Sequence, residues 1–390
     1  MDESFETDLQ QSDPQISHKP KEITEFSLAI SDSSILERAK TSWWKQIRIG
    51  KIVMFGISLY LFVMAITLMK DGAGGITPVL GNLFEVSSGA NSLGFGWLFA
   101  YLIMSGSPVA AAALTFFDAG IINELSAFTM ITGSRLGASF IVIVIGFIYI
   151  LRGRDREASL SMGTLAFTVT ASTYLPGLFL GILLLRSGYF DRVQIGSGVL
   201  LTSVFDTMIQ PVTNLVAGIL PHWLVFISGI VIISFSFSLF DRCLPQMTLK
   251  ESHLGWVSRL VYRPVIMFAL GAFVTMISMS VSISLSLLVP LSYRGFIRRE
   301  NVIPYIMGAN ITTFIDTLLA SMLLENQAAF NIVLVEMVSV TIISMLILIL
   351  FYSSYRRNTL NFFNWVTAST RNLVIFLITI LLTPLFLILI

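Results

Sequence analysis

The chain has 390 residues, of which 55% are hydrophobic and only 12% are charged. Apolar runs of about 18 residues or more follow one another, which predicts an all-α polytopic membrane protein. The formal net charge of +1 does not indicate nucleic-acid binding, and the single Cys243 excludes an internal disulfide and a cysteine-rich metal site. We expect no signal peptide, because the first apolar run begins at Ile52.

Residues 1–40 are polar and rich in Asp, Glu and Ser, so they predict a disordered N-terminal tail. Trp43 and Trp44 follow among several lysines and an arginine. Aromatic and basic residues beside an apolar run are typical of an interface anchor on the cytoplasmic side. We therefore expect a multi-pass protein of the cell (plasma) membrane with its N-terminus in the cytoplasm.

Residues 41–195 are predicted to form a first transmembrane repeat. Its apolar stretch 93–118 is interrupted at Ser105–Pro108, where Pro108 removes a backbone donor. Two half-length helices around a polar break predict a re-entrant helical hairpin, and one kinked helix is the alternative. The next crossing, at 127–151, is expected to break at Gly133.

Residues 196–221 are predicted to form a connecting membrane segment. Asp206 and Gln210 fall one turn apart in it, which favours packing of polar groups between helices. The segment either crosses fully or is partly re-entrant or flat on the membrane.

A second transmembrane repeat is predicted at residues 222–352, with a hairpin at about 264–293. A broken helix at 302–324 carries an amide, several hydroxyls and a carboxylate, with Gly308 at the expected break. Residues 363–390 are predicted to be a C-terminal transmembrane helix.

The two repeats correspond at one constant shift along the chain, here called the repeat offset. It places Gly133 on Gly308 and Met104-Ser-Gly-Ser107 on Met279-Ser-Val-Ser282. Interrupted segments at matching places in two halves indicate the central site of a transporter. The distribution of basic residues gives the two hairpins opposite orientations, which predicts inverted repeats. A full crossing by residues 196–221 would make the repeats parallel instead.

The run Gly308-Ala-Asn-Ile-Thr-Thr is similar to the G-A-N-I-G-T-T element of the sodium-dependent inorganic phosphate cotransporter family. That family carries two such elements, each after a Q-S-S-S element in a re-entrant hairpin. Between about Ile52 and Tyr352 the chain resembles a divergent, bacterial-type member. It departs from the family pattern where Met104 and Met279 replace the glutamines and Arg135 takes the place that Asn310 holds in the other half.

The resemblance implies a phosphate site at the two breaks, because helix N-termini and hydroxyls replace the water around an oxyanion. It also implies a sodium site, since unwound carbonyls, amides and carboxylates supply hard oxygens. The expected substrate-binding residues are Ser105, Ser107, Ser280, Ser282, Arg135, Thr312 and Thr313, and the expected cation-binding residues are Asn310, Asp316 and Ser278.

Arg135 allows several interpretations. Its guanidinium can clamp an anion, or stand where relatives bind a cation. It can also form a structural pair with Asp118 or Asp206, or reach toward the surface. Glu336 lies inside an apolar run, so it is either a proton or cation site or a member of an interfacial pair.

The sequence thus predicts a secondary active transporter that moves inorganic phosphate or a related oxyanion. Sodium is the expected coupling ion, and access is expected to alternate around a midplane site between the repeats. The alternatives are a degenerate, non-transporting sensor or partner subunit, and a transporter of another anion such as a carboxylate. We expect no enzyme, since no nucleophile–base set is apparent, and no cofactor or metal beyond sodium. The bilayer is the expected surrounding, and a homodimer is left open.

Overall fold

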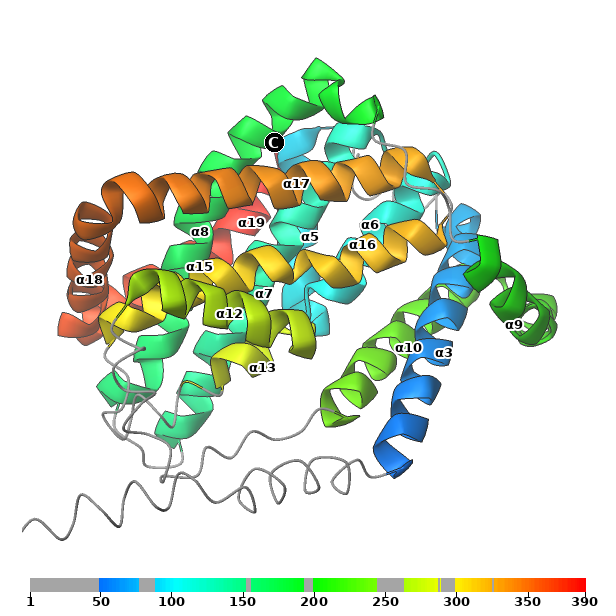
Figure 1. The fold of residues 1–390 in the computed structure, drawn as a ribbon, viewed down its shortest axis with the longest axis horizontal. Helices are drawn as coiled ribbons and strands as arrows, with labels where there is room; N and C mark the ends of the chain where they lie inside the picture. The colour runs from blue at the N-terminus through cyan, green and yellow to red at the C-terminus, as the bar shows by residue number, and fades with distance from the viewer. Residues whose placement is uncertain are drawn as a thin grey trace, which may run out of the picture. The chain divides into compact units, whose positions relative to one another are not determined.

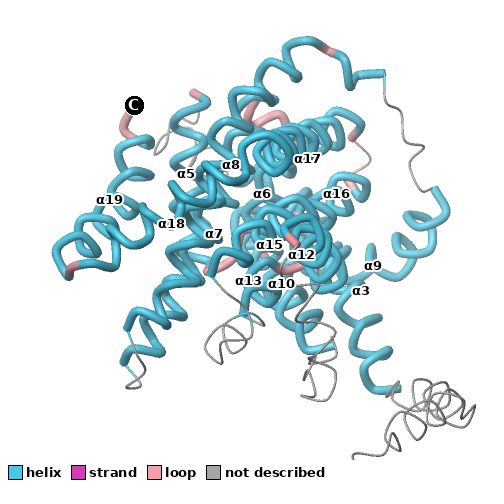
Figure 2. The backbone as a smooth tube through the Cα atoms, turned by 60° about the vertical axis from the view of Figure 1, so that its left-hand side comes forward, coloured by secondary structure: helices cyan, strands magenta, loops and turns pink. Residues whose placement is uncertain are grey.

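The computed structural model describes residues 49–76, 88–151, 156–192, 199–243, 263–286, 288, 299–324 and 326–390. Within these ranges the regular structure is helical and contains no strand (Figure 2). Seven helices in the described residues are long and apolar enough to cross a membrane. The prediction of an all-α polytopic membrane protein is confirmed at this level. The predicted tail, residues 1–40, lies outside the described residues.

The helices follow the chain in two sets (Figure 1). The first set is α3 (Ile49–Gly72), the 3-10 turn η1 (Ala73–Gly75), α5 (Gly89–Ile103), α6 (Ser107–Asp118), α7 (Glu124–Leu151), α8 (Arg156–Ser187), the 3-10 turn η2 (Tyr189–Arg192) and α9 (Val199–Ile219). The second set is α10 (His222–Cys243), α12 (Pro264–Ser278), α13 (Val281–Ser286), α15 (Arg299–Thr312), α16 (Phe314–Leu323), α17 (Gln327–Leu346), the π-helical turn η4 (Ile347–Phe351), α18 (Tyr352–Ala368) and α19 (Thr370–Ile388).

Both M-S-x-S motifs interrupt a helix at the same residue. Met104 ends α5 with φ of 57°, and Met279 ends α12 with φ of 49°. They are the non-glycine residues with positive φ in the described part of the chain. A methionine in the left-handed region ends the helix because its backbone dihedral angles no longer follow the right-handed α-helix, and its Cβ then crowds the following carbonyl oxygen. Pro108 then opens α6 in its first turn, where its missing N–H has no intrahelical acceptor to lose.

Helices α5 and α6 run in opposite directions along α7. Gly133 and Gly137 of α7 face the carbonyls of Leu93 and Trp97 in the same chain order, so α5 and α7 are parallel. Gly106 packs against Ser134 near the middle of α7, and α6 then returns to the start of α7 through a short turn. The chain therefore doubles back at the Met104 break. One kinked helix would instead have continued in roughly the same direction.

The same contacts recur in the second half at the repeat offset. A Cβ at Gly133 would lie 2.1 Å from the Leu93 carbonyl oxygen, and one at Gly308 would lie 2.0 Å from that of Phe268. Likewise, a Cβ at Gly96 would lie 2.1 Å from the Met130 carbonyl oxygen, and one at Gly271 would lie 2.0 Å from that of Tyr305. Both halves thus join the corresponding pair of helices, α5 with α7 and α12 with α15, through backbone approaches that only glycine permits.

The two expected glycine breaks are corrected by the structure. Helix α7 runs unbroken through Gly133, and Gly308 lies inside α15. These glycines provide room for a neighbouring carbonyl rather than a change of backbone direction. The interruption in the second half falls at Thr313, between α15 and α16.

The C-terminal helix also begins later than predicted. Helical structure continues through η4 and α18 to Ala368, and Ser369 adopts an extended backbone there. Its hydroxyl accepts from the Asn372 N–H, which caps α19 at Thr370 rather than near 363.

Helices α3 and α10 pack side by side in antiparallel directions. Phe62 contacts Phe237, and nearer the start of α3 Ser58 exchanges hydroxyl-to-carbonyl hydrogen bonds with Ser236 at 2.8 and 2.7 Å. At the other end Gly72 lies against Phe226. Phe62 and Phe237 are separated by the repeat offset, so corresponding positions of the two halves meet each other here.

Candidate functional site

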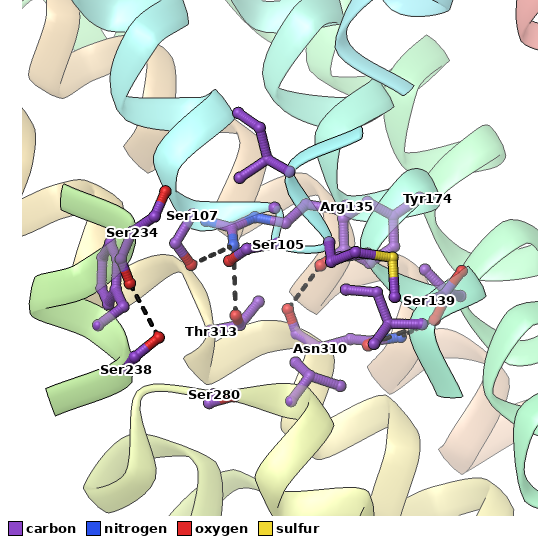
Figure 3. Close-up of a pocket in the computed structure, with 18 residues that line it drawn as sticks. Ser105, Ser107, Arg135, Ser139, Tyr174, Ser234, Ser238, Ser280, Asn310 and Thr313 are labelled. Carbon is purple, nitrogen blue, oxygen red and sulfur yellow. Dashed lines mark hydrogen bonds between the residues drawn. The ribbon is translucent and has the colours of Figure 1, made fainter. Parts of the chain in front are cut away.

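A cavity of roughly 330 Å³ lies where the two helix breaks meet. Its polar lining comes from both sets of helices (Figure 3). Ser234 and Ser238 of α10 lie on the opposite side of that view from Ser139 and Tyr174. The polar residues around it are Ser105, Ser107, Arg135, Ser139, Thr170, Tyr174, Ser234, Ser238, Ser280, Asn310 and Thr313.

The lining contains corresponding residues of the two halves. Ser105 and Ser280 both line the cavity and are related by the repeat offset, as are Arg135 with Asn310 and Ala138 with Thr313. A cavity lined by equivalent positions lies between the halves, at the point where both helices are interrupted. This is where broken helices place a transporter's substrate site.

Arg135 is the centre of a buried polar network. Its Nη2 lies 3.2 Å from Asp316 Oδ1, and the two side chains are 4% and 1% exposed. The same nitrogen donates to the Thr317 hydroxyl, while Nη1 lies 3.4 Å from both the Ser107 and Thr313 hydroxyls. Ser107 in turn donates to the second Asp316 oxygen. The network ties α6 and α7 of the first set to α16 of the second.

An aromatic pair supports the guanidinium from one side. Arg135 Cζ lies 5.0 Å from the centre of the Phe314 ring, which stacks on Tyr174 at 5.8 Å. The Tyr174 hydroxyl donates to the Asn310 carbonyl at 2.7 Å, and Asn310 Nδ2 donates to Thr170 at 3.1 Å. A desolvated cation on an aromatic face gains electrostatic energy in addition to its ion pair. Arg135 is thereby held in one position.

Of the predicted site residues, six line the cavity: Ser105, Ser107, Ser280, Arg135, Thr313 and Asn310. Thr312 instead donates to the Ala272 carbonyl of α12 at 2.8 Å. Ser278 contacts the Ser280 backbone and shapes the break. Asp316 is not a lining residue and instead pairs with Arg135. The side chain of Ser282 lies outside the described residues.

The structure also excludes two of the interpretations of Arg135, a pair with Asp118 and a side chain that reaches toward the surface. Asp118 is not its partner, because Lys70 Nζ lies 3.2 Å from Asp118 Oδ2 and Asn326 donates to Asp118 Oδ1 at 2.9 Å. The side chain of Asp206, the other suggested partner, lies outside the described residues. Arg135 is buried, so it does not reach toward the surface.

Five polar lining residues escaped the sequence analysis as site residues: Ser139 of α7 and two pairs on other helices. Thr170 and Tyr174 of α8 are spaced four apart, as are Ser234 and Ser238 of α10. This spacing places each pair on one helix face, and that signal is readable from sequence. Many other hydroxyls in the same helices share it, however, because Ser and Thr in apolar helices commonly bond to the carbonyl one turn earlier.

Chemically, the cavity offers many hydroxyls and one guanidinium. Arg135 is the single residue with a formal charge among the described lining residues. No group of three His, Cys, Asp or Glu side chains suited to a metal ion is found in the described ranges. Comparisons with protein-family models, curated proteins and solved structures found no match to this chain.

Proposed function

We propose that this chain is a secondary active transporter that moves inorganic phosphate or a related oxyanion across the membrane. The observation that carries the proposal is the cavity at the two helix breaks, whose described lining combines one guanidinium with hydroxyls from both halves. A guanidinium and hydroxyl donors replace the hydration shell of an oxyanion. The G-A-N-I resemblance favours phosphate within that class.

We further propose that the halves are inverted repeats and that α5–α6 and α12–α13 are re-entrant hairpins. The antiparallel packing of α3 and α10 supports inversion, because these helices occupy corresponding places in the two halves. The turn at Met104 lies beside the middle of α7, at the depth where a re-entrant hairpin would reverse. On this arrangement α9 does not cross the membrane.

Sodium coupling remains the expectation that the resemblance supplies. The Asp316 carboxylate is neutralised by Arg135, so it contributes no net charge to a cation while that pair stands. Any sodium site would then use neutral oxygens such as those of Asn310 and the unwound backbone. Alternating access would proceed by movement of one half against the other around the cavity.

The test is uptake of radiolabelled phosphate into proteoliposomes, with and without an inward sodium gradient. Asn310→Ala should lower the initial rate about tenfold or more, because it leaves the Thr170 hydroxyl without its partner and opens the cavity wall. Asn361→Ala, on an exposed face of α18, is the matched control and should transport like wild type. Equal loss in both variants would reject the site.

The non-transporting alternative is favoured by one observation, the buried Arg135–Asp316 pair between the two halves. If that pair locks the halves together, wild type will show no uptake and Arg135→Asn will gain it. If phosphate gives no signal in either protein, competition by carboxylates and other oxyanions in a binding assay would identify another anion.

A further inference from the structure

Glu336 of α17 is a buried acid that the cavity network leaves out. Its side chain is 1% exposed, and both of its carboxyl oxygens lack a hydrogen-bond partner among the described residues. It sits well inside a helix that is apolar enough to cross the membrane. Acidic residues at such depth occur where a cation or proton is bound, since a bare carboxylate there is strongly disfavoured.

The hydroxyl groups that interact with Glu336 already donate to other acceptors. Thr132 of α7 faces it, but its hydroxyl donates to the Phe128 carbonyl at 3.1 Å. Tyr174 of α8 donates to the Asn310 carbonyl at 2.7 Å. Without donors the neutral acid is favoured over the carboxylate, and the neutral acid has the Thr132 hydroxyl oxygen as an acceptor.

Arg135 of α7, the guanidinium that pairs with Asp316 of α16, also interacts electrostatically with Glu336. One cation therefore acts on two carboxyl groups. Arg135 bonds to Asp316, yet its Nε is buried and has no hydrogen-bond partner in the described part of the chain. Two carboxylates beside one guanidinium carry an uncompensated negative charge, so one proton is needed to make this buried cluster neutral.

We propose that Glu336 is a proton-binding site and that its proton is carried together with the transported anion. A proton from one aqueous side forms an O–H bond with the Glu336 carboxylate, and release to the other side breaks the same bond. In the protonated state Arg135 pairs with Asp316, as the structure shows. Loss of the proton gives Arg135 a second anionic partner and weakens the tie between α7 and α16. This inference rests on the transport function proposed above.

The first experiment compares two modes of phosphate movement in proteoliposomes, with Glu336→Gln as the variant. Net uptake driven by an inward proton gradient should fall about tenfold or more, because glutamine neither gains nor loses a proton. Exchange of labelled for unlabelled phosphate needs no net proton movement, so it should stay within about twofold of wild type. Glu300→Gln makes the same chemical change at a partly exposed pair with Arg356 and should alter neither mode.

Two results would overturn the proton site while leaving transport intact. One is gradient-driven uptake that persists in Glu336→Gln, and the other is wild-type uptake that does not respond to the proton gradient. Absence of exchange in wild type would instead reject the phosphate-transport function itself.

A second measurement tests proton binding without any transport. Infrared difference spectra of the purified protein, recorded across a pH titration, report the carbonyl stretch of a buried protonated carboxylic acid. That band should appear in wild type and Glu300→Gln and be lost in Glu336→Gln. Its persistence in Glu336→Gln, or its absence from wild type, would contradict the assignment in a folded protein.

Discussion

The buried ion pair of Arg135 and Asp316 requires polar partners from the residues around it. Both side chains are almost fully buried, and hydroxyls of Ser107, Thr313 and Thr317 surround them. Burying two charges is unfavourable unless the remaining hydrogen-bonding capacity is also satisfied. These hydroxyls supply part of that capacity, while Arg135 Nε has no hydrogen-bond partner in the described part of the chain.

Removing one member of this pair should be far more disruptive than removing a member of an exposed pair. Asp316→Asn removes the carboxylate that bonds to the buried Arg135 guanidinium, so we expect a loss of about 3–5 kcal/mol in the free energy of unfolding. Glu300→Gln breaks a pair whose side chains are 42% and 36% exposed and should lose about 0–1 kcal/mol. Unfolding of the purified proteins in mixed micelles measures both free-energy changes. Similar losses in the two variants would contradict the larger stabilisation that we assign to the buried pair.

At the scale of elements, the helix pairs α5–α7 and α12–α15 are joined through glycine rather than through large side chains. Gly308 and Gly271 of the second half face the carbonyls of Phe268 and Tyr305, and the corresponding glycines of the first half make the same approaches. In lipid, association between helices depends on such close packing because burying apolar side chains gains little. The repeated glycines thus fix the position of each helix break relative to its supporting helix.

Gly308→Ala should therefore separate α12 from α15. Its added Cβ would lie 2.0 Å from a backbone oxygen, which no side-chain rotation relieves, so we expect destabilisation of roughly 1–3 kcal/mol or more. Gly56→Ala in α3 has nothing within 4 Å of its new Cβ and should be neutral or stabilise by about 0.4–1 kcal/mol. Thermal unfolding curves of the two variants give the comparison. Equal midpoints would mean that the helices do not approach as closely as described.

For the whole molecule, the arrangement of α3, α9 and α10 decides whether the halves are inverted. The end of α3 meets the start of α10, since a Cβ at Gly75 would lie 2.5 Å from His222 Cβ. Helix α9 lies between η2 and α10 in the order of the chain. If α9 does not cross, the ends of α3 and α8 and the start of α10 share one side of the membrane.

Single-cysteine labelling tests this topology in a Cys243→Ser background. A membrane-impermeant maleimide added to intact cells should label Gly74→Cys and Tyr189→Cys, both of which replace exposed residues. Arg242→Cys, at the exposed far end of α10, should react only after the cells are permeabilised. Labelling of Gly74→Cys and Arg242→Cys from the same side would show that α3 and α10 cross in the same direction and that the repeats are not inverted.

The membrane class, the repeat offset and the hydroxyl-rich helix breaks beside Met104 and Met279 could be predicted from the order of the residues alone. These features follow from apolar length, self-similarity and local chemistry, and each is written in contiguous residues. Of the six predicted site residues that line the cavity, Ser105, Ser107 and Ser280 lie at or beside those breaks. Local reasoning went wrong at Gly133 and Gly308, since a glycine in an apolar helix marks either a break or a close neighbour.

The packing of the helices shows that Gly133 and Gly308 mark close neighbours rather than breaks, because the carbonyls of Leu93 and Phe268 belong to other helices, far away along the chain. The packing also decided that Arg135 pairs with Asp316 rather than Asp118, and that Glu336 interacts electrostatically with the same guanidinium. These charges come from α7, α16 and α17, which only packing brings together. Pairing of buried charges depends on distance in space, and the order of residues along a chain does not contain that distance.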